Sequence, residues 1–569
     1  MAVDFSGEEV RSIEAQLAQH RPGGWCRLLF GEIDRVPRLA ARAGWYLDVP
    51  AGQFVCDRVD YIHLLIDHAF PRTEPRVVIP SLDLGDWPHV EPNGVLCLQK
   101  TSWGKDPGDR AIECLVDVSE LLDYDDARCR DEFTREFSSY WNQRVHADAP
   151  VFLTLNVPTG PTRSIYFSRM RNGVRYVLGD NADSVKRWLQ HAGETVGTDL
   201  VKKTLLIWLP QPWLPSEFPA SVRQVLSLFD RNSRDAYLRV GESLPVLFGS
   251  NTTTGPVFVG VEIPAIPPSY FRKGFRAGHI SGAAIAQPLK PQSVGRFRVE
   301  RADPAWVHGR DRNEQQAKLA AKRVAIIGSG SLGAPVARLL AQTGIGRFIF
   351  VDHDHLSSPN TSRHVLGAEF VRENKAIAMR SMLLRDFPHL DEVEAIDSRF
   401  EKLNEDQLKR LATCDLIISA GIDFASDAHL DDWRRSLESP PVHLCTWVEA
   451  FALAGHAVAL FGTDSLLDGF TRGRKVNFRL TDWPDDARVR LVEAGCGDQF
   501  QPHGAIELGH TVNVAAKSAL DILTGDIRQS GRREWLGDCE EVIRRGGTPT
   551  SAFDQSFAIK TKPWSSGEH

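Results

Sequence analysis

The chain has 569 residues, of which 42% are hydrophobic and 25% charged, and its formal net charge is −7. This composition is typical of soluble globular domains, and the mild acidity argues against a general nucleic-acid binder, which would show a basic face. No apolar run is long enough to span a membrane. The N-terminus lacks a signal-peptide pattern, and nine cysteines without regular spacing favour a reducing cytoplasm.

The length predicts a multidomain α/β protein. Residues 1–148 form the first expected unit, with a helix over 8–19 and helical character over 131–141. Residues 149–304 show alternating apolar patterns and no chemical motif, which indicates an α/β connector. Residues 305–547 form the expected third unit, and residues 548–569 a mobile tail rich in Ser, Thr and Lys. The strands expected in the connector are 150–155, 175–178, 205–209 and 257–262.

One segment of the first unit carries a candidate nucleophile. Cys97 stands between two leucines just after an Asn-Gly turn, and His89 follows Pro88 upstream. A cysteine here can accept an acyl group by thioester exchange and pass it to an amine. A strand-end cysteine of purely structural use is the alternative. His89 can stabilise an oxyanion or act as a base, or it can serve only the fold.

The third unit opens with a nucleotide-binding pattern. Residues 324–327 predict a short buried strand, and 334–342 predict a helix. Gly328, Gly330 and Gly333 lie between them, where a tight turn lets the backbone approach a phosphate. A second strand at 348–351 ends at Asp352, the place where an acid usually binds ribose hydroxyls.

The residues downstream of Asp352 distinguish between nucleotides. Asn360, Arg363 and Lys375 follow it, and Asp423 follows a strand expected at 416–419. An enzyme that cleaves ATP needs cations against the phosphates and an acid for Mg²⁺. A dehydrogenase relies mainly on backbone amides. The alternative for Arg363 and Lys375 is an ordinary solvated face.

This order and spacing resembles the ThiF/MoeB and ubiquitin-activating superfamily over about residues 305–530. The resemblance implies a Rossmann-like domain that adenylates a protein's C-terminal carboxylate. It implies that Asp352 binds the ribose, that Asp423 binds Mg²⁺, and that Asn360, Arg363 and Lys375 bind the phosphates. Family members also use an arginine donated across a homodimer. Arg310 and Arg312 occupy that position, and the sequence does not choose between them, although Arg312 is our working assignment.

The resemblance also points to a second thiol. In the family, a loop crossing the nucleotide site carries a cysteine that captures the acyl group, and Cys496 lies in a Gly-rich and Pro-rich loop at that point. A buried structural cysteine is the alternative. Cys539 is the second candidate, whereas Cys445 lies in an apolar strand and is expected in the core. No Cys-x-x-Cys pair is present in the sequence, so no zinc site is expected.

The first unit resembles a ubiquitin-conjugating enzyme, an α+β fold whose acceptor thiol corresponds to Cys97. The usual His-Pro-Asn is replaced here, so that His89 takes the position of the Asn that supports the oxyanion. This departure affects the transfer mechanism more than the fold.

Together the two resemblances describe a fused activating and conjugating enzyme, similar in particular to the ligases of CBASS antiphage systems. They imply that a cGAS-like nucleotidyltransferase, or alternatively a dedicated ubiquitin-like protein, is joined to a protein target. Two readings of other classes remain, a nicotinamide-dependent oxidoreductase and a non-enzymatic scaffold. The first would leave Arg363, Lys375 and Asp423 unused, and ATP rather than NAD binding would discriminate against it. Against the second, each nucleophile position of the families holds a cysteine, and failure of ATP–pyrophosphate exchange would support it.

Overall fold

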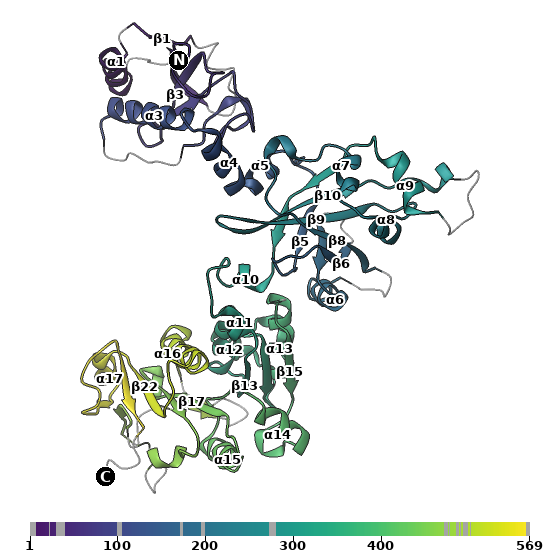
Figure 1. Cartoon of the computed structure of the whole chain (residues 1–569). Coiled ribbons are helices and arrows are strands. Elements are labelled where there is room, and N and C mark those ends of the chain that lie inside the picture. Colours follow the sequence, from purple (N-terminus) through teal and green to yellow (C-terminus); the bar gives the residue numbers. More distant parts are fainter. Residues whose placement is uncertain are drawn as a thin grey trace. The chain divides into compact units, whose positions relative to one another are not determined.

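The computed structural model describes residues 7–21, 23–29, 40–98, 105–170, 175–194, 200–271, 280–387, 389–470, 476, 478–484, 489, 491–492, 499–500 and 502–564. The chain forms two compact units, one of residues 1–181 with 201–300 and one of residues 182–200 with 301–569 (Figure 1). Among the described residues, no helix is both long and apolar enough to cross a membrane.

The N-terminal part of the first unit is an antiparallel sheet packed against helices. The strands lie in the order β1 (Trp25–Arg27), β2 (Ala41–Asp48), β3 (Tyr61–Asp67) and β4 (Arg76–Val78). Helices α1 (Glu8–His20) and α3 (Pro107–Leu122) contact each other, and their apolar faces join those of the strands in one core. Burying that face is what stabilises so small a sheet. The short helix η1 (Pro92–Gly94) leads to Cys97.

A helix expected over 131–141 is instead two helices, α4 (Asp126–Arg135) and α5 (Phe137–Gln143). The break falls at Glu136, whose φ of −100° and ψ of 21° are not helical. Phe137, Tyr140 and Trp141 of α5 are buried in the core of the following sheet, and the Trp141 indole donates to the Phe297 carbonyl at 3.0 Å. The break therefore lets α5 pack with the connector.

The connector is a mixed eight-stranded sheet in the order β11-β10-β9-β8-β6-β7-β5-β12, which confirms its α/β assignment. Pairs β5/β7 and β8/β9 are parallel, and the other hydrogen-bonded pairs that we describe are antiparallel. All four strands expected from the sequence are present. The elements are β5 (Val151–Thr154), β6 (Arg163–Arg169), β7 (Arg175–Gly179), β8 (Lys202–Trp208), α7 (Val222–Ser227), α8 (Arg231–Tyr237), β9 (Leu244–Thr252), β10 (Gly255–Ile263), α9 (Gly282–Leu289), β11 (Gly295–Phe297) and β12 (Val299–Arg301).

The second unit contains an eight-stranded sheet in the order β15-β14-β13-β16-β17-β18-β22-β24. Its first five strands are parallel and the last three join antiparallel. The strands are β13 (Arg323–Ile327), β14 (Arg347–Val351), β15 (Glu392–Ile396), β16 (Leu416–Ala420), β17 (Val442–Val448), β18 (Ala454–Leu460), β22 (Gly531–Leu536) and β24 (Ala558–Pro563).

Helices cover both faces of this sheet, which explains its continuous apolar runs. Residues of α12 (Gly333–Gln342), α13 (Lys375–Asp386) and α16 (Ala505–Thr524) share the core on one face. Residues of α14 (Glu405–Ala412) and α15 (Phe424–Arg435) share the core on the other. The shorter elements are α6 (Ala182–His191), α10 (Pro304–Val307), α11 (Gln316–Ala320), β19 (Thr481–Asp482), β20 (Leu491–Val492), β21 (Gln499–Phe500), α17 (Cys539–Arg544) and β23 (Thr548–Pro549).

The strands and helix predicted around the Gly-rich turn are confirmed as β13, α12 and β14. The C-terminal segment differs from the expected mobile tail, because β24 pairs with β22 along its whole length. Lys560 and Lys562 alternate with Ile559 and Thr561 there. Ile559 and Thr561 are exposed and Lys560 is only partly so, which indicates an edge strand that is solvated over most of its surface.

Candidate functional site

A cavity of about 370 Å³ opens where β13, β14 and β16 end. Its wall contains seven of the eight nucleotide-site residues that the sequence singled out, since only Gly333 does not line it. Ligands bind at this edge of parallel sheets because strand ends and helix N-termini meet there. The seven residues are Gly328, Gly330, Asp352, Asn360, Arg363, Lys375 and Asp423.

The three glycines differ in what a Cβ atom at each position would contact. Gly328 has a φ of +91°, and a Cβ there would lie 2.7 Å from Ile422 Cγ2. A Cβ on Gly333, the first residue of α12, would lie 2.0 Å from the Gly328 carbonyl oxygen. At Gly330 a Cβ would meet nothing within 4 Å. The turn therefore needs glycine at two positions for its own geometry, and at Gly330 it leaves the backbone open to a ligand.

Asp352 ties this turn to the next strand. Its carboxylate accepts the Ser329 amide at 2.6 Å and the Asp354 amide at 2.8 Å. Burial raises the pKa of Asp352, and the two amides and nearby Lys375 oppose that rise. The side chain is 8% exposed and lies on the cavity wall.

Basic side chains also line the cavity. Lys375, the first residue of α13, donates to Asp354 Oδ2 at 3.0 Å, and its side chain is only 12% exposed. Arg363 ends the short helix η4 (Ser358–Ser362) and lines the cavity. Arg399 also lines it and donates to His353 Nε2 at 3.1 Å.

Sequence reasoning missed Arg399. It follows β15, whose carboxyl end lies at the same edge of the sheet as those of β13 and β14. Recognising 392–396 as a parallel strand of this sheet would have directed attention to it.

Asp423 occupies the N-cap of α15. One carboxylate oxygen accepts the amides of Ala425 and Ser426, both at 3.0 Å, and the other accepts the Ser426 hydroxyl at 2.9 Å. The Ser426 amide is the largest cause of the lowered pKa of Asp423, so this acid is ionised at neutral pH. Since it also faces the cavity, its remaining lone pairs suit a hard cation such as Mg²⁺.

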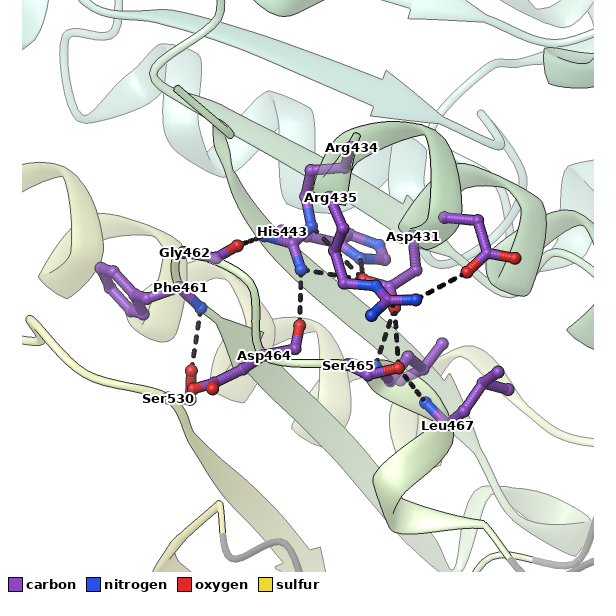
Figure 2. Close-up of polar contacts among 12 residues, drawn as sticks. Asp431, Arg434, Arg435, His443, Phe461, Gly462, Asp464, Ser465, Leu467 and Ser530 are labelled. Carbon is purple, nitrogen blue, oxygen red and sulfur yellow. Dashed lines mark hydrogen bonds and ion pairs between the residues drawn. The ribbon is translucent and has the colours of Figure 1, made fainter. Parts of the chain in front are cut away.

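A buried polar network anchors the helix that Asp423 caps (Figure 2). Arg434 near the end of α15 is 0% exposed and donates to the carbonyls of Gly462 at 2.6 Å and Asp464 at 2.7 Å. It also pairs with Asp431 at 2.9 Å, and Asp431 accepts the Leu466 amide. This network fixes the C-terminal part of the helix whose N-cap is Asp423.

The expected trans-acting arginines lie elsewhere in this chain. Arg310 has a φ of +51° and stacks on the Trp306 ring at 5.8 Å. Neither Arg310 nor Arg312 is among the described residues that line the cavity. The structure of one chain does not bring them to the predicted site.

The first candidate thiol belongs to the N-terminal sheet region of the first unit. Cys97 is exposed, and its amide donates to the His89 carbonyl at 2.8 Å. Partial desolvation raises the pKa of its thiol, and the carboxylates of Glu91 and Glu136 add to the rise, while Arg76 opposes it. The thiol is therefore not activated by its surroundings in this state.

His89 is held by groups that the sequence did not reveal. Its φ is +59°, and its amide donates to the Tyr140 hydroxyl at 2.7 Å. Its Nε2 lies 3.3 Å from Glu132 Oε2, and its Nδ1 lies 3.7 Å from Glu136 Oε2. Both ring nitrogens thus face carboxylates from the α4–α5 segment, not an open oxyanion position.

The other three cysteines considered in the sequence differ in their surroundings. Cys496 lies outside the described residues. Cys445 is 1% exposed and its thiol donates to Asp427 at 3.4 Å, which confirms its place in the core. Cys539 begins α17 and is half-buried against an apolar cluster.

In comparisons with known proteins, one family model matches each of the two compact units. Residues 308–459 match the model of the ThiF family, and residues 55–150 match that of the Prokaryotic E2 family B. One chain thus fuses a segment similar to the ThiF family with a segment similar to the prokaryotic E2 family. Both resemblances drawn from the motifs are confirmed.

Relatives of known description match parts of the fusion. A stretch of 219 residues is 30% identical to the ATP-dependent ubiquitin transferase-like protein Cap2 of Pseudomonas aeruginosa, covering 36% of this chain and 37% of that protein. Another of 130 residues is 28% identical to the SAMP-activating enzyme E1 of Haloferax volcanii, covering 23% and 47%. The chain thus spans less than half of each relative's length. A crystal structure of E. coli MccB matches at 16% identity with a TM-score of 0.30, over 44% of this chain and 65% of that one, which is too distant to carry an argument.

Proposed function

We propose that the fusion activates a protein's C-terminal carboxylate with ATP and conjugates it to an amine on a target protein. The observation that supports this most is the convergence of Asn360, Arg363, Lys375 and Asp423 on one cavity beside the Gly-rich turn. A pyrophosphate held only by backbone amides would not need this set of charges.

In this proposal the nucleotide lies along the cavity wall. Asp352 binds the ribose, and Gly330 admits the phosphates close to the backbone. Asn360, Arg363 and Lys375 offset the phosphate charge, and Arg399 adds a further cation. Mg²⁺ held by Asp423 would neutralise charge on the leaving pyrophosphate.

The chemistry then proceeds by acyl transfer. A carboxylate oxygen of the donor attacks the α-phosphorus, and pyrophosphate leaves. The Cys496 thiolate attacks the acyl carbon and AMP leaves. The Cys97 thiolate next displaces Cys496, and a lysine amine finally displaces Cys97. The printed names of the relatives, a ubiquitin transferase-like protein and an activating enzyme, support this class of reaction.

For the acyl donor we propose a cGAS-like nucleotidyltransferase, with a dedicated ubiquitin-like protein as the alternative. We also propose a cytoplasmic homodimer in which Arg310 or Arg312 reaches the nucleotide of the second copy. The proposals for the donor, the homodimer and the arginine are supported by the resemblance of the motifs and by the similarity to Cap2.

The test incubates the full chain with ATP·Mg²⁺ and each candidate donor in turn. Intact mass and non-reducing gels should show a thiol-sensitive adduct with one donor. The adduct should disappear in Lys375→Met and persist in Lys409→Met, a matched change on the exposed face of α14. Binding of NAD in place of ATP, with no adduct, would contradict the proposal.

A further inference from the structure

The break between α4 and α5 places two acidic side chains beside one part of the N-terminal sheet region. Glu132 lies in the last turn of α4 and Glu136 directly follows that helix. One helical turn separates them, so their side chains lie on one face. That face meets the His89 ring, as the distances of 3.3 and 3.7 Å show.

The arrangement is better suited to handling a proton than to holding a metal ion. A single ion binds one imidazole nitrogen, but here each carboxylate flanks a different nitrogen of His89. Two acids on opposite nitrogens of one ring fix its orientation. With the Tyr140 hydroxyl on its amide, His89 becomes a rigid bridge between the helix pair and the Cys97 backbone.

The two acids are not equivalent. The Glu132 side chain is 10% exposed and also pairs with Arg135. The Glu136 side chain is 26% exposed and pairs more loosely with His89. Glu136 is also one of the charges acting on the Cys97 thiol. Of these two acids, Glu136 is the more exposed, and it contacts His89, whose carbonyl accepts the Cys97 amide at 2.8 Å.

We propose that Glu136 is the general base for attack of an amine on the thioester carried by Cys97, with His89 and Glu132 as positioning residues. This rests on the proposed function only in that Cys97 carries an acyl group. The lysine ammonium first loses one proton to water. The resulting neutral amine forms the C–N bond and gives its second proton to the Glu136 carboxylate. The C–S bond breaks, and its electron pair stays with the Cys97 sulfur as thiolate.

The negative surroundings also define the acceptor class. Glu136 and Glu91 disfavour an approaching anion and attract an ammonium group. The acceptor should therefore be a lysine side chain rather than a thiolate or a carboxylate.

The test does not require the protein that serves as acyl donor. Cys97 of the full chain is loaded directly with a fluorescent glycine-ending tripeptide, supplied as its mercaptoethanesulfonate thioester, and the loaded site is verified by peptide mass spectrometry. Release by free lysine is then compared with release by hydroxylamine, which is largely uncharged at neutral pH and needs no base. Glu136→Gln should slow release by lysine at least about tenfold and leave release by hydroxylamine within about twofold.

Asp131→Asn is the matched control, because Asp131 is an exposed acid on the same helix. It should change neither rate. His89→Asn should slow only the lysine reaction, since a merely structural role would alter both. An unchanged lysine rate in Glu136→Gln, or an equal loss with both nucleophiles, would overturn the proposal. Because loading bypasses ATP, failure of this test is distinguishable from failure of carboxylate activation.

Discussion

Two glycines of the Gly-rich turn, Gly330 and Gly333, are needed for different reasons, and this difference can be measured. Gly333 leaves room for the Gly328 carbonyl at the start of α12, whereas Gly330 leaves room only for whatever enters the cavity. An added methyl group therefore tests folding at Gly333 and ligand binding at Gly330.

Gly330→Ala should keep the free energy of unfolding within about 0.5 kcal/mol of the wild type. Its affinity for a non-hydrolysable ATP analogue should fall at least about tenfold, or about 1.4 kcal/mol, by calorimetry. Gly333→Ala should instead destabilise the domain by about 1–3 kcal/mol, because the added atom overlaps backbone. Equal affinities for Gly330→Ala and wild type would show that no phosphate approaches this turn.

Asp423 has two roles in our interpretation, as helix cap and as magnesium ligand, and one substitution separates them. Asn caps a helix about as well as Asp but carries no charge. Asp423→Asn should therefore leave thermal unfolding close to wild type while reducing ATP-dependent adduct formation about 10²-fold or more. Asp230→Asn is the control, since Asp230 caps α8 in the connector. Retained activity in Asp423→Asn would remove the magnesium assignment.

At the scale of helices and strands, the sequence predicted most of the features that depend on the local pattern of residues. Apolar runs located β13, β14 and β16, because a strand buried on both faces has no polar positions. The Gly spacing located the turn and the start of α12. The cavity wall followed, since strand order places these ends together.

Features that depend on distant contacts were not predictable. Nothing in residues 131–141 signals a break at Glu136, because the break follows from packing Trp141 into the connector core. The alignment of Glu132 and Glu136 with His89 depends on that break. Likewise, β24 is polar in sequence and is a strand only because β22 supplies its hydrogen bonds.

The Arg434–Asp431 pair should be among the costliest contacts of α15 to break. Arg434→Met should destabilise the second unit by about 3–5 kcal/mol, because Asp431 would remain buried with only the looser pair to Arg435 beside it. Hydrogen exchange across residues 424–467 should rise accordingly. Arg435→Met is the control, since its side chain is 32% exposed and its pairing is looser; a cost equal to that of Arg434→Met would contradict the argument.

The same pair has a defined dependence on pH. Burial opposes ionisation of Asp431, but His443, the Leu466 amide and Arg434 together lower its pKa to about 2. The unfolded value is about 3.9, so the ionised form stabilises the fold fully above about pH 4. That contribution should be lost as pH falls from about 4 towards 2. Urea midpoints across this range should decline less in Asp431→Asn than in the wild type.

At the scale of the whole molecule, the proposed function places two reaction centres in one chain. Covalent linkage holds one thiol at a high effective concentration near the other, provided that the connector lets them meet. Transfer from Cys496 to Cys97 within one chain should then not depend on protein concentration.

Mixing Cys97→Ala with Cys496→Ala chains tests this directly. If transfer occurs within a chain, the mixture should form conjugate far more slowly than wild type, and its rate should rise with concentration. Wild type diluted from about 1 μM to about 10 nM should keep its rate per chain, because the effective concentration of linked sites is about millimolar. If the mixture matches wild type at every dilution, the acyl group passes between two copies, and a stable homodimer is the functional unit.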